Sequence, residues 1–401
     1  MKAVKANLRP KLEKENKNYP VSLKNEGKKH REMENLKEGR LAHAKFAYTT
    51  RRVPRDVIIT LLPGEKHPRA GDLVLARVIK LGQHEHLELP DGRRAALFPG
   101  DEIVLTFGNR YAPDQFEAVV PGRLLSPCHL VAAGGIAAQT LHKHSKMHSP
   151  TDILPLGLLG DMDSHRINLS RWALTSMKPD SSANRPLTIA ITGTSMNSGK
   201  TTVISSLTRG LISTGQRVAA AKISGTGAGG DHWRMIDAGA NPALDFVDAG
   251  VASTYLLSPN EMDKVTDTIL GHLMEAPVDI ILLEISDGLL EPETTRLLAK
   301  SNLKNFLDAV IFTAYDAMGA IGGINWLRLH NLPVIAISGL ISNSPLAMRE
   351  ALATAEIPIY STGSLIQSEV ASTILDCVNS RALSRRKEVA KENLKGIRLR
   401  P

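Results

Sequence analysis

LTIAITGTSMNSGKTT, residues 187–202, is the stretch that decides the fold of the second half of the chain. Its β-favouring apolar residues enter a glycine-containing loop, and the loop passes directly into an amphipathic pattern of Val203, Leu207 and Leu211. This order predicts a strand, a phosphate loop and a helix. Backbone amides and a helix N-terminus attract phosphate, a lysine adds positive charge, and the hydroxyl that follows it can bind Mg²⁺.

The spacing of this loop differs from the common one. Five residues separate Gly193 from Gly199, whereas the usual pattern has four. A glycine-rich turn with an incidental lysine is the alternative, but the flanking strand and helix favour nucleotide binding. We therefore predict nucleotide contacts from the whole loop and its exit, namely Gly193, Thr194, Ser195, Met196, Asn197, Ser198, Gly199, Lys200, Thr201 and Thr202.

Strand-like and helix-like patterns alternate after residue 186. This alternation predicts an α/β fold, a P-loop nucleotide-binding domain whose mostly parallel sheet is covered by helices on both faces. Ligands of such sheets bind beyond the carboxyl ends of the strands. The predicted strands are 187–192, 217–222, 279–284, 309–313 and 333–338.

Charged residues follow two of these strands. Lys222 ends the second strand and Asp231 follows in a glycine-rich loop, while Glu284 ends the third. Buried ion pairs are the structural alternative, but such groups near one phosphate loop indicate a site. A carboxylate there can hold Mg²⁺ directly or through water. We predict Thr201, Asp231 and Glu284 as metal ligands, and Lys200, Lys222 and Asp231 as catalytic residues.

Composition limits the broad class of the protein. The chain has 401 residues, 42% of them hydrophobic and 22% charged, which is typical of globular domains. Its net charge of +8 has three possible explanations: a nucleic-acid partner, an acidic substrate, or basic tails alone. Cys128 and Cys377 lie too far apart in sequence for a disulfide framework. The N-terminus lacks the apolar core of a signal peptide, and apolar runs such as 278–285 are too short to span a membrane. We predict a cytoplasmic protein with no membrane partner.

Changes of texture along the chain predict its domains. A basic flexible arm covers 1–50, because this stretch shows little hydrophobic period. Short apolar runs separated by turns predict a small β-barrel-like domain at 51–150. A linker at 151–185 leads into the nucleotide-binding domain at 186–380, and a basic helical tail covers 381–401.

Several polar groups of the first half leave alternatives open. Arg110 could meet a phosphate or carboxylate and Tyr111 could stack on a ligand, although a capping loop is the simpler interpretation. Residues 130–139 suggest a strand, a turn at Gly134 and Gly135 that could offer amides to an anion, and a helix of small residues.

A group of histidines nearby invites a metal site. His142, His144 and His148 recur closely, but their spacing matches no strong zinc signature. A solvated loop is the simpler interpretation.

With these motifs in hand, the second half resembles the dethiobiotin synthetase-like branch of P-loop proteins, which includes amidoligases of cobyrinate type. That family's loop, G-T-D-T-x-V-G-K-T, has the length of 193–201, and its K-P-V-x-[ST]-G aligns with 222–227. Its E-G-A-G-G followed by proline resembles Glu284-Ile-Ser-Asp-Gly with Pro292. Its G-x-x-x-x-I-N-H-A-L-L segment resembles 319–327. The resemblance covers about 187–380.

The resemblance implies ATP and Mg²⁺ as cofactors, with Asn343 facing adenine. It implies phosphoryl transfer to a small-molecule acceptor, as a kinase or as the activating step of a ligase, and we expect a homo-oligomer. Ser195 replaces the loop aspartate of the family, so the nucleotide half carries over and the acceptor does not. Asp237, Asp245 and Asp248 have no counterpart; they either bind the acceptor or cap helices.

Two other function classes stay open. The basic ends could bind nucleic acid or a protein partner, with the P-loop as a slow ATP switch, or the chain could be a polynucleotide kinase. A metallochaperone-type GTPase would prefer guanine.

Overall fold

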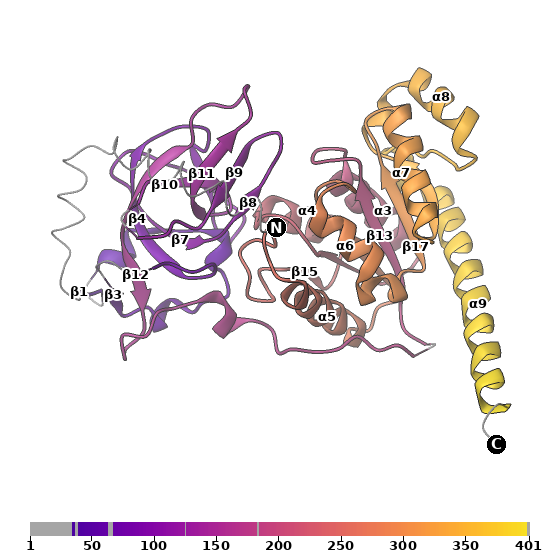
Figure 1. Ribbon diagram of the computed structural model, residues 1–401, viewed down its shortest axis with the longest axis horizontal. Helices are drawn as coiled ribbons and strands as arrows, with labels where there is room; N and C mark the ends of the chain where they lie inside the picture. The colour runs from indigo at the N-terminus through magenta and orange to yellow at the C-terminus, as the bar shows by residue number, and fades with distance from the viewer. Residues whose placement is uncertain (1–33, 37–38, 63–66, 125, 183, 399–401) are drawn as a thin grey trace. The chain divides into compact units, whose positions relative to one another are not determined.

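The structure is a computed structural model that describes residues 34–36, 39–62, 67–124, 126–182 and 184–398, the last fourteen of these by backbone alone. The chain forms two compact units. The first contains residues up to 174 together with two short stretches from further along the chain, 226–230 and 247–255. The second contains 175–225, 231–246 and the residues from 256 onward. Figure 1 labels their helices and strands.

The second unit is built on a parallel sheet of six strands in the order β15-β14-β16-β13-β17-β18. The first strand in sequence, β13, therefore lies inside the sheet between β16 and β17. All five predicted strands are present. The strands are β13 (Leu187–Gly193), β14 (Val218–Lys222), β15 (Ala243–Asp245), β16 (Ile280–Glu284), β17 (Ala309–Thr313) and β18 (Val334–Ser338).

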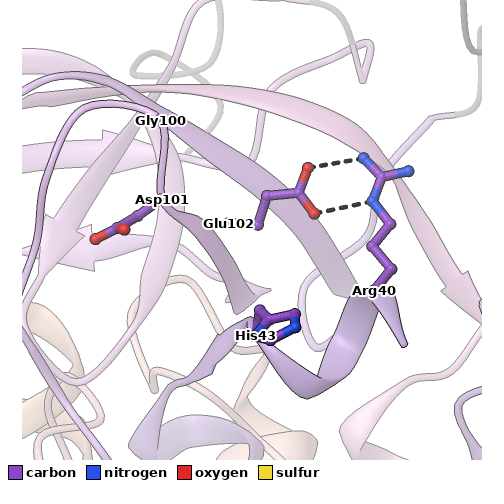
Figure 2. A pocket seen from close by; sticks show the side chains of 5 residues that line it. All are labelled: Arg40, His43, Gly100, Asp101 and Glu102. Carbon is purple, nitrogen blue, oxygen red and sulfur yellow. Dashed lines mark hydrogen bonds and ion pairs between the residues drawn. The ribbon is translucent and has the colours of Figure 1, made fainter.

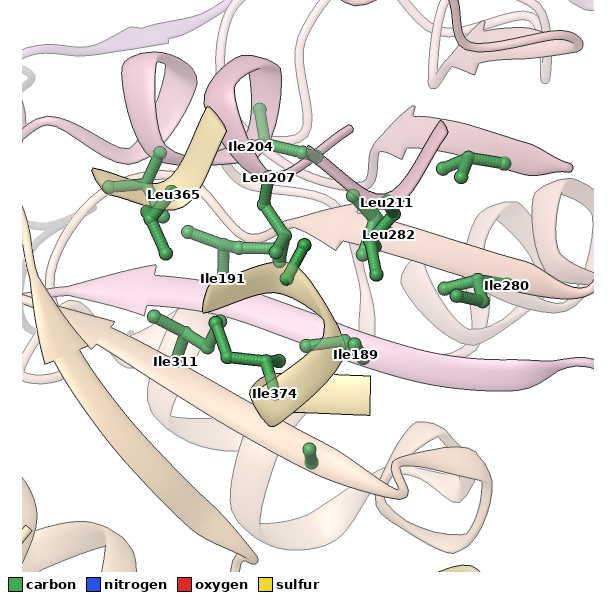
Figure 3. Close-up of a cluster of buried hydrophobic side chains, with 14 of the residues drawn as sticks. Ile189, Ile191, Ile204, Leu207, Leu211, Ile280, Leu282, Ile311, Leu365 and Ile374 are labelled. Atoms are coloured by element: carbon green, nitrogen blue, oxygen red, sulfur yellow. The ribbon is translucent and has the colours of Figure 1, made fainter. Parts of the chain in front are cut away.

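Helices follow the strands of this sheet because the intervening sequence has an apolar stripe at helical spacing. On one face of the sheet, Leu207 and Ile374 pack with strand residues such as Ile191 in the core shown in Figure 3. Phe312, the neighbour of the core residue Ile311, approaches Gly323 of α7. Since successive strand residues point to opposite faces, α7 covers the other face. The helices are α3 (Lys200–Ser213), α4 (Gly229–Asp237), α5 (Pro259–Glu275), α6 (Pro292–Lys300), α7 (Ala317–Leu329), α8 (Pro345–Ala355) and α9 (Ser368–Arg398).

Short 3-10 helices connect the strands and helices of both units. The two cysteines do not form a disulfide bond with each other. Cys128 is buried in the first unit and Cys377 is exposed on α9. Among the described residues, no helix has both the length and the apolar character needed to cross a membrane. The turns are η1 (Arg40–Ala42), η2 (Tyr48–Thr50), η3 (Arg55–Val57), η4 (Leu169–Trp172), η5 (Asn302–Phe306), η6 (Leu340–Asn343) and η7 (Ser364–Ile366).

The first unit is rich in β-strands. Its pairings close a circuit, β12-β4-β7-β11-β10 and back to β12, with further strands attached to it. Leu105, Phe107 and Leu158 belong to its buried core. Its strands are β1 (Glu34–Asn35), β2 (Lys45–Phe46), β3 (Thr60–Leu62), β4 (Leu73–Lys80), β5 (His86–Glu88), β6 (Arg94–Ala96), β7 (Glu102–Phe107), β8 (Arg110–Tyr111), β9 (Phe116–Val119), β10 (Cys128–Ala132), β11 (Ile136–Lys143) and β12 (Thr151–Gly160).

Three predictions for this half need correction. The small residues after Gly135 form β11, not a helix, because pairing with three strands outweighs the helix propensity of alanine. The predicted linker begins too early, since β12 is a sheet strand; its Pro155 lies at a register shift that accommodates a residue without an amide hydrogen. The arm ends before residue 50, because Phe46 and Tyr48 are buried. Residues 1–33 lie outside the described part of the chain.

A pocket of about 630 Å³ in the first unit is lined by Arg40, His43, Gly100, Asp101 and Glu102 (Figure 2). Arg40 donates two hydrogen bonds of 2.8 Å to the Glu102 carboxylate, one from Nε and one from Nη2. These bonds hold the pKa of Glu102 below its ordinary value, although burial acts to raise it. The folded state therefore favours the charged carboxylate.

Glu102→Gln is expected to lower the free energy of unfolding by about 1 kcal/mol at neutral pH, because it removes one charge of a bidentate pair. The folded-state pKa of Glu102 is depressed, so this contribution is complete above the unfolded-state pKa and disappears as pH falls through the folded-state value. Urea unfolding of both proteins at neutral and acid pH measures the difference. A difference that persists in acid would contradict the ion pair, and exposed Glu85→Gln is the control.

Candidate nucleotide and metal site

The phosphate loop leaves β13 at Gly193 and enters α3 at Lys200. A Cβ at Gly193 would lie 2.2 Å from the Thr313 hydroxyl oxygen, so a side chain does not fit there. Gly199 has a φ of 102°, which favours glycine. The first amides of α3 have no acceptor within the helix, so the loop ends at groups suited to an anion.

The side chain of Lys200 turns back and binds the backbone of the phosphate loop. Its side-chain nitrogen donates to the carbonyl oxygen of Ser195 at 2.7 Å and to that of Asp287 at 3.1 Å. The residue is 6% exposed, and this burial lowers its pKa, while Glu284 and Asp287 oppose the shift. A phosphate would be a stronger, charged partner for the ammonium group than the two carbonyls.

Three oxygen-bearing side chains meet at the start of α3. Thr201 Oγ1 donates to Glu284 Oε1 at 2.9 Å and lies 3.2 Å from Asp231 Oδ1. The second carboxylate oxygen of Glu284 is buried and has no hydrogen-bond partner among the residues that the structure describes. One hydroxyl and two carboxylates, one of which has a buried oxygen without a partner, suit a hard cation such as Mg²⁺. The predicted metal ligands Thr201, Asp231 and Glu284 are therefore together in space.

A second lysine joins this cluster from β14. Lys222 forms an ion pair with Asp231, and it lies beside Glu284 in the register of the sheet. Burial acts to lower the pKa of Lys222, but Asp231 and Glu284 outweigh it, and the pKa is raised. Lys222 is therefore a fixed positive charge, held next to the predicted metal ligands.

Glu284 is the electrostatically strained member of the cluster. Burial, and then the charge of Asp231, raises the pKa of Glu284 to about 7. By contrast, the pKa of Asp231 is lowered: burial opposes this, and Lys222 overcomes it. A divalent cation would favour the charged form of both carboxylates.

The other predicted nucleotide residues have different surroundings. The Ser198 hydroxyl is buried against that of Thr313 at 2.7 Å, so its side chain supports the loop and does not face a ligand. Asn197 and Asn343 are exposed, and Asn343 ends the η6 turn. The Thr194 hydroxyl is buried without a partner. Met196 and Thr202 are partly exposed.

Two further residues adjoin the site. The carbonyl of Asp287 binds Lys200 from a left-handed backbone, with φ of 64°. Asp245 ends β15, is 2% exposed and lies beside Lys222 in the sheet register. The sequence left two roles open for Asp245, binding the acceptor or capping a helix; β15 was not predicted because it is only three residues long. Of its companions, Asp248 pairs with Arg51 within the first unit and Asp237 is exposed at the end of α4.

The polar groups of the first half are engaged locally. Arg110 is buried and donates to Gln115 at 2.8 Å, while Tyr111 packs against Tyr255. Burial, and then Arg110, lowers the pKa of His84 to about 4.

The histidine cluster does not assemble as a metal set. His142 binds Glu117 at 2.7 Å. In the described part of the chain, the side chains that come together as a set of three His, Cys, Asp or Glu residues are Asp161, Asp163 and His165, and Asp161 already pairs with Arg171.

Comparison with known proteins adds little. No protein family and no curated protein matches the sequence. Among solved structures, the signal recognition particle receptor FtsY from Elizabethkingia anophelis is 14% identical, with a TM-score of 0.31, covering 50% of this chain and 66% of the receptor chain. A second FtsY structure, in complex with GDP, is 14% identical with a TM-score of 0.33, covering 44% and 57%. This chain thus spans 66% or less of either receptor chain, and scores this low leave the site itself as the basis for function.

Proposed function

We propose that the protein is an ATP- and Mg²⁺-dependent enzyme that transfers the γ-phosphoryl group to a small acceptor, as a kinase or as the activating step of a ligase. The observation that carries the proposal is the second lysine. Lys222, paired with Asp231 beside Thr201 and Glu284, adds a fixed cation to the phosphate loop and its lysine. Phosphoryl transfer needs mainly positioning and neutralisation of charge, which these groups supply.

Each group has a role in this proposal. The loop amides and Lys200 bind the β- and γ-phosphates and hold the transferring group in place. Thr201, Asp231 and Glu284 hold Mg²⁺, which would neutralise phosphate charge when bound. Lys222 binds the acceptor or the γ-phosphate. Because Asp231 is paired with Lys222, it is unsuited to remove a proton, and a carboxylate or carbamate acceptor would need no general base.

The choice of ATP rests on the resemblance to the dethiobiotin synthetase-like branch. The loop length and Asn343 after β18 support it. Ser195, in place of the family's aspartate, supports a different acceptor. The nucleic-acid alternative stays a prediction, since the basic arm lies largely outside the described residues. The expected homo-oligomer and the cytoplasmic location also stay predictions.

Calorimetric titration of ATP and GTP, with Mg²⁺ and with EDTA, tests the proposal. We expect ATP to bind more tightly than GTP and Mg²⁺ to be required for turnover. Incubation with γ-labelled ATP and pools of small carboxylates, amines and alcohols should label one class. Preference for GTP would support the metallochaperone-type alternative, and absence of nucleotide binding would refute the proposal.

A further inference from the structure

Helix α4, which carries Asp231, follows Ala228, whose side chain has no hydrogen-bond acceptor. The residues before it are Thr226, Gly227 and Ala228, and the helix starts at Gly229. A helix start leaves amide hydrogens without partners, and neither glycine nor alanine has a side-chain acceptor to supply one.

Glu88 supplies this acceptor. Its Oε2 accepts a hydrogen bond of 2.7 Å from the amide of Gly229, across 141 residues of sequence. Both residues belong to the first compact unit. A carboxylate at a helix N-terminus is favoured by the helix dipole, and a charged acceptor strengthens the bond.

The stretch before the helix is held firmly within the same unit. The amide of Gly227 donates to the carbonyl of Ala252 at 2.9 Å, and Thr226 forms a β-bridge with Ser253. A Cβ on Gly134 would lie 2.1 Å from the carbonyl oxygen of Gly227, so the two backbones are in close contact. The turn at Gly134 therefore packs directly against the backbone of this stretch.

Asp231 lies two residues after Gly229 in the same helix, so the cap and the proposed metal ligand are less than one turn apart. We infer that Glu88 is a positioning residue: by capping α4 it keeps the first turn of the helix formed and so sets the direction in which the Asp231 side chain leaves that turn. This inference rests on the proposed function for the role of Asp231.

Glu88→Ala removes the acceptor, whereas Glu88→Gln keeps an oxygen that can accept the same hydrogen bond. Exposed Glu85→Ala is the matched control. For Glu88→Ala we expect half-maximal turnover to require about a tenfold higher Mg²⁺ concentration, and kcat to fall by a similar factor. The affinity for ATP measured in EDTA should not change. Glu88→Gln should restore most of both. A general loss of structure would instead weaken ATP binding and resist rescue.

Amide hydrogen exchange of 229–237 provides a readout that needs no activity. We expect faster exchange of this helix in Glu88→Ala than in the wild type or Glu85→Ala. Equal exchange in all three proteins would overturn the capping role. Faster exchange with an unchanged Mg²⁺ dependence would overturn the positioning role. If the wild type binds no nucleotide, the proposed function fails, and the exchange data still decide the capping role.

Discussion

Lys200→Ala is expected to reduce phosphoryl transfer about a thousandfold and to weaken ATP binding clearly. Lys200 is the only charged side chain within the phosphate loop sequence, and it is held between the carbonyls of Ser195 and Asp287. Without the ammonium group, the negative charge of the transferring phosphoryl would face carbonyl oxygens instead of a cation. Calorimetry gives the affinity and single-turnover kinetics gives the transfer rate.

Companion variants separate charge from packing. Lys200→Met keeps the buried side-chain stem and should lose as much activity as Lys200→Ala. Lys200→Arg keeps the charge but needs more room than a residue that is 6% exposed provides, so little rescue is expected. Lys300→Ala, exposed on α6, is the control. An unchanged ATP affinity in Lys200→Ala would show that the loop is not the nucleotide site.

Lys222→Met is expected to reduce transfer about a hundredfold while ATP affinity in EDTA changes little. Lys222 ends β14, which β16 separates from β13, and its ion pair is with Asp231. Its loss should therefore affect the transferring group and the acceptor more than the bound nucleotide. The acceptor KM and kcat measured at saturating ATP test this division.

The pair with Asp231 allows a sharper experiment. Lys222→Met leaves Asp231 as a partly buried charge without its lysine partner and should lower stability, whereas adding Asp231→Asn should restore stability but not activity. Lys264→Met, exposed on α5, is the control. Full activity in the double variant would show that the pair is only structural.

Much of the candidate site could be predicted because its parts are local in sequence. The strand, loop and helix around Lys200 follow from patterns a few residues long. Lys222 and Glu284 could be placed together because each ends a strand of one parallel sheet, and the structure sets them side by side in register. The contact of Lys200 with the backbone carbonyl of Asp287 could not be predicted, because every residue has such a carbonyl and its use depends on the backbone conformation.

By itself, the sequence determined the α/β character of the second half, the phosphate loop and the charged strand ends, since periodicity and glycine spacing are local properties. Only the tertiary structure decided that 136–143 is a strand and that β12 belongs to the sheet, because pairing between distant strands outweighs local propensity. It also decided that Glu88 caps the helix of Asp231, a contact between residues far apart in the chain.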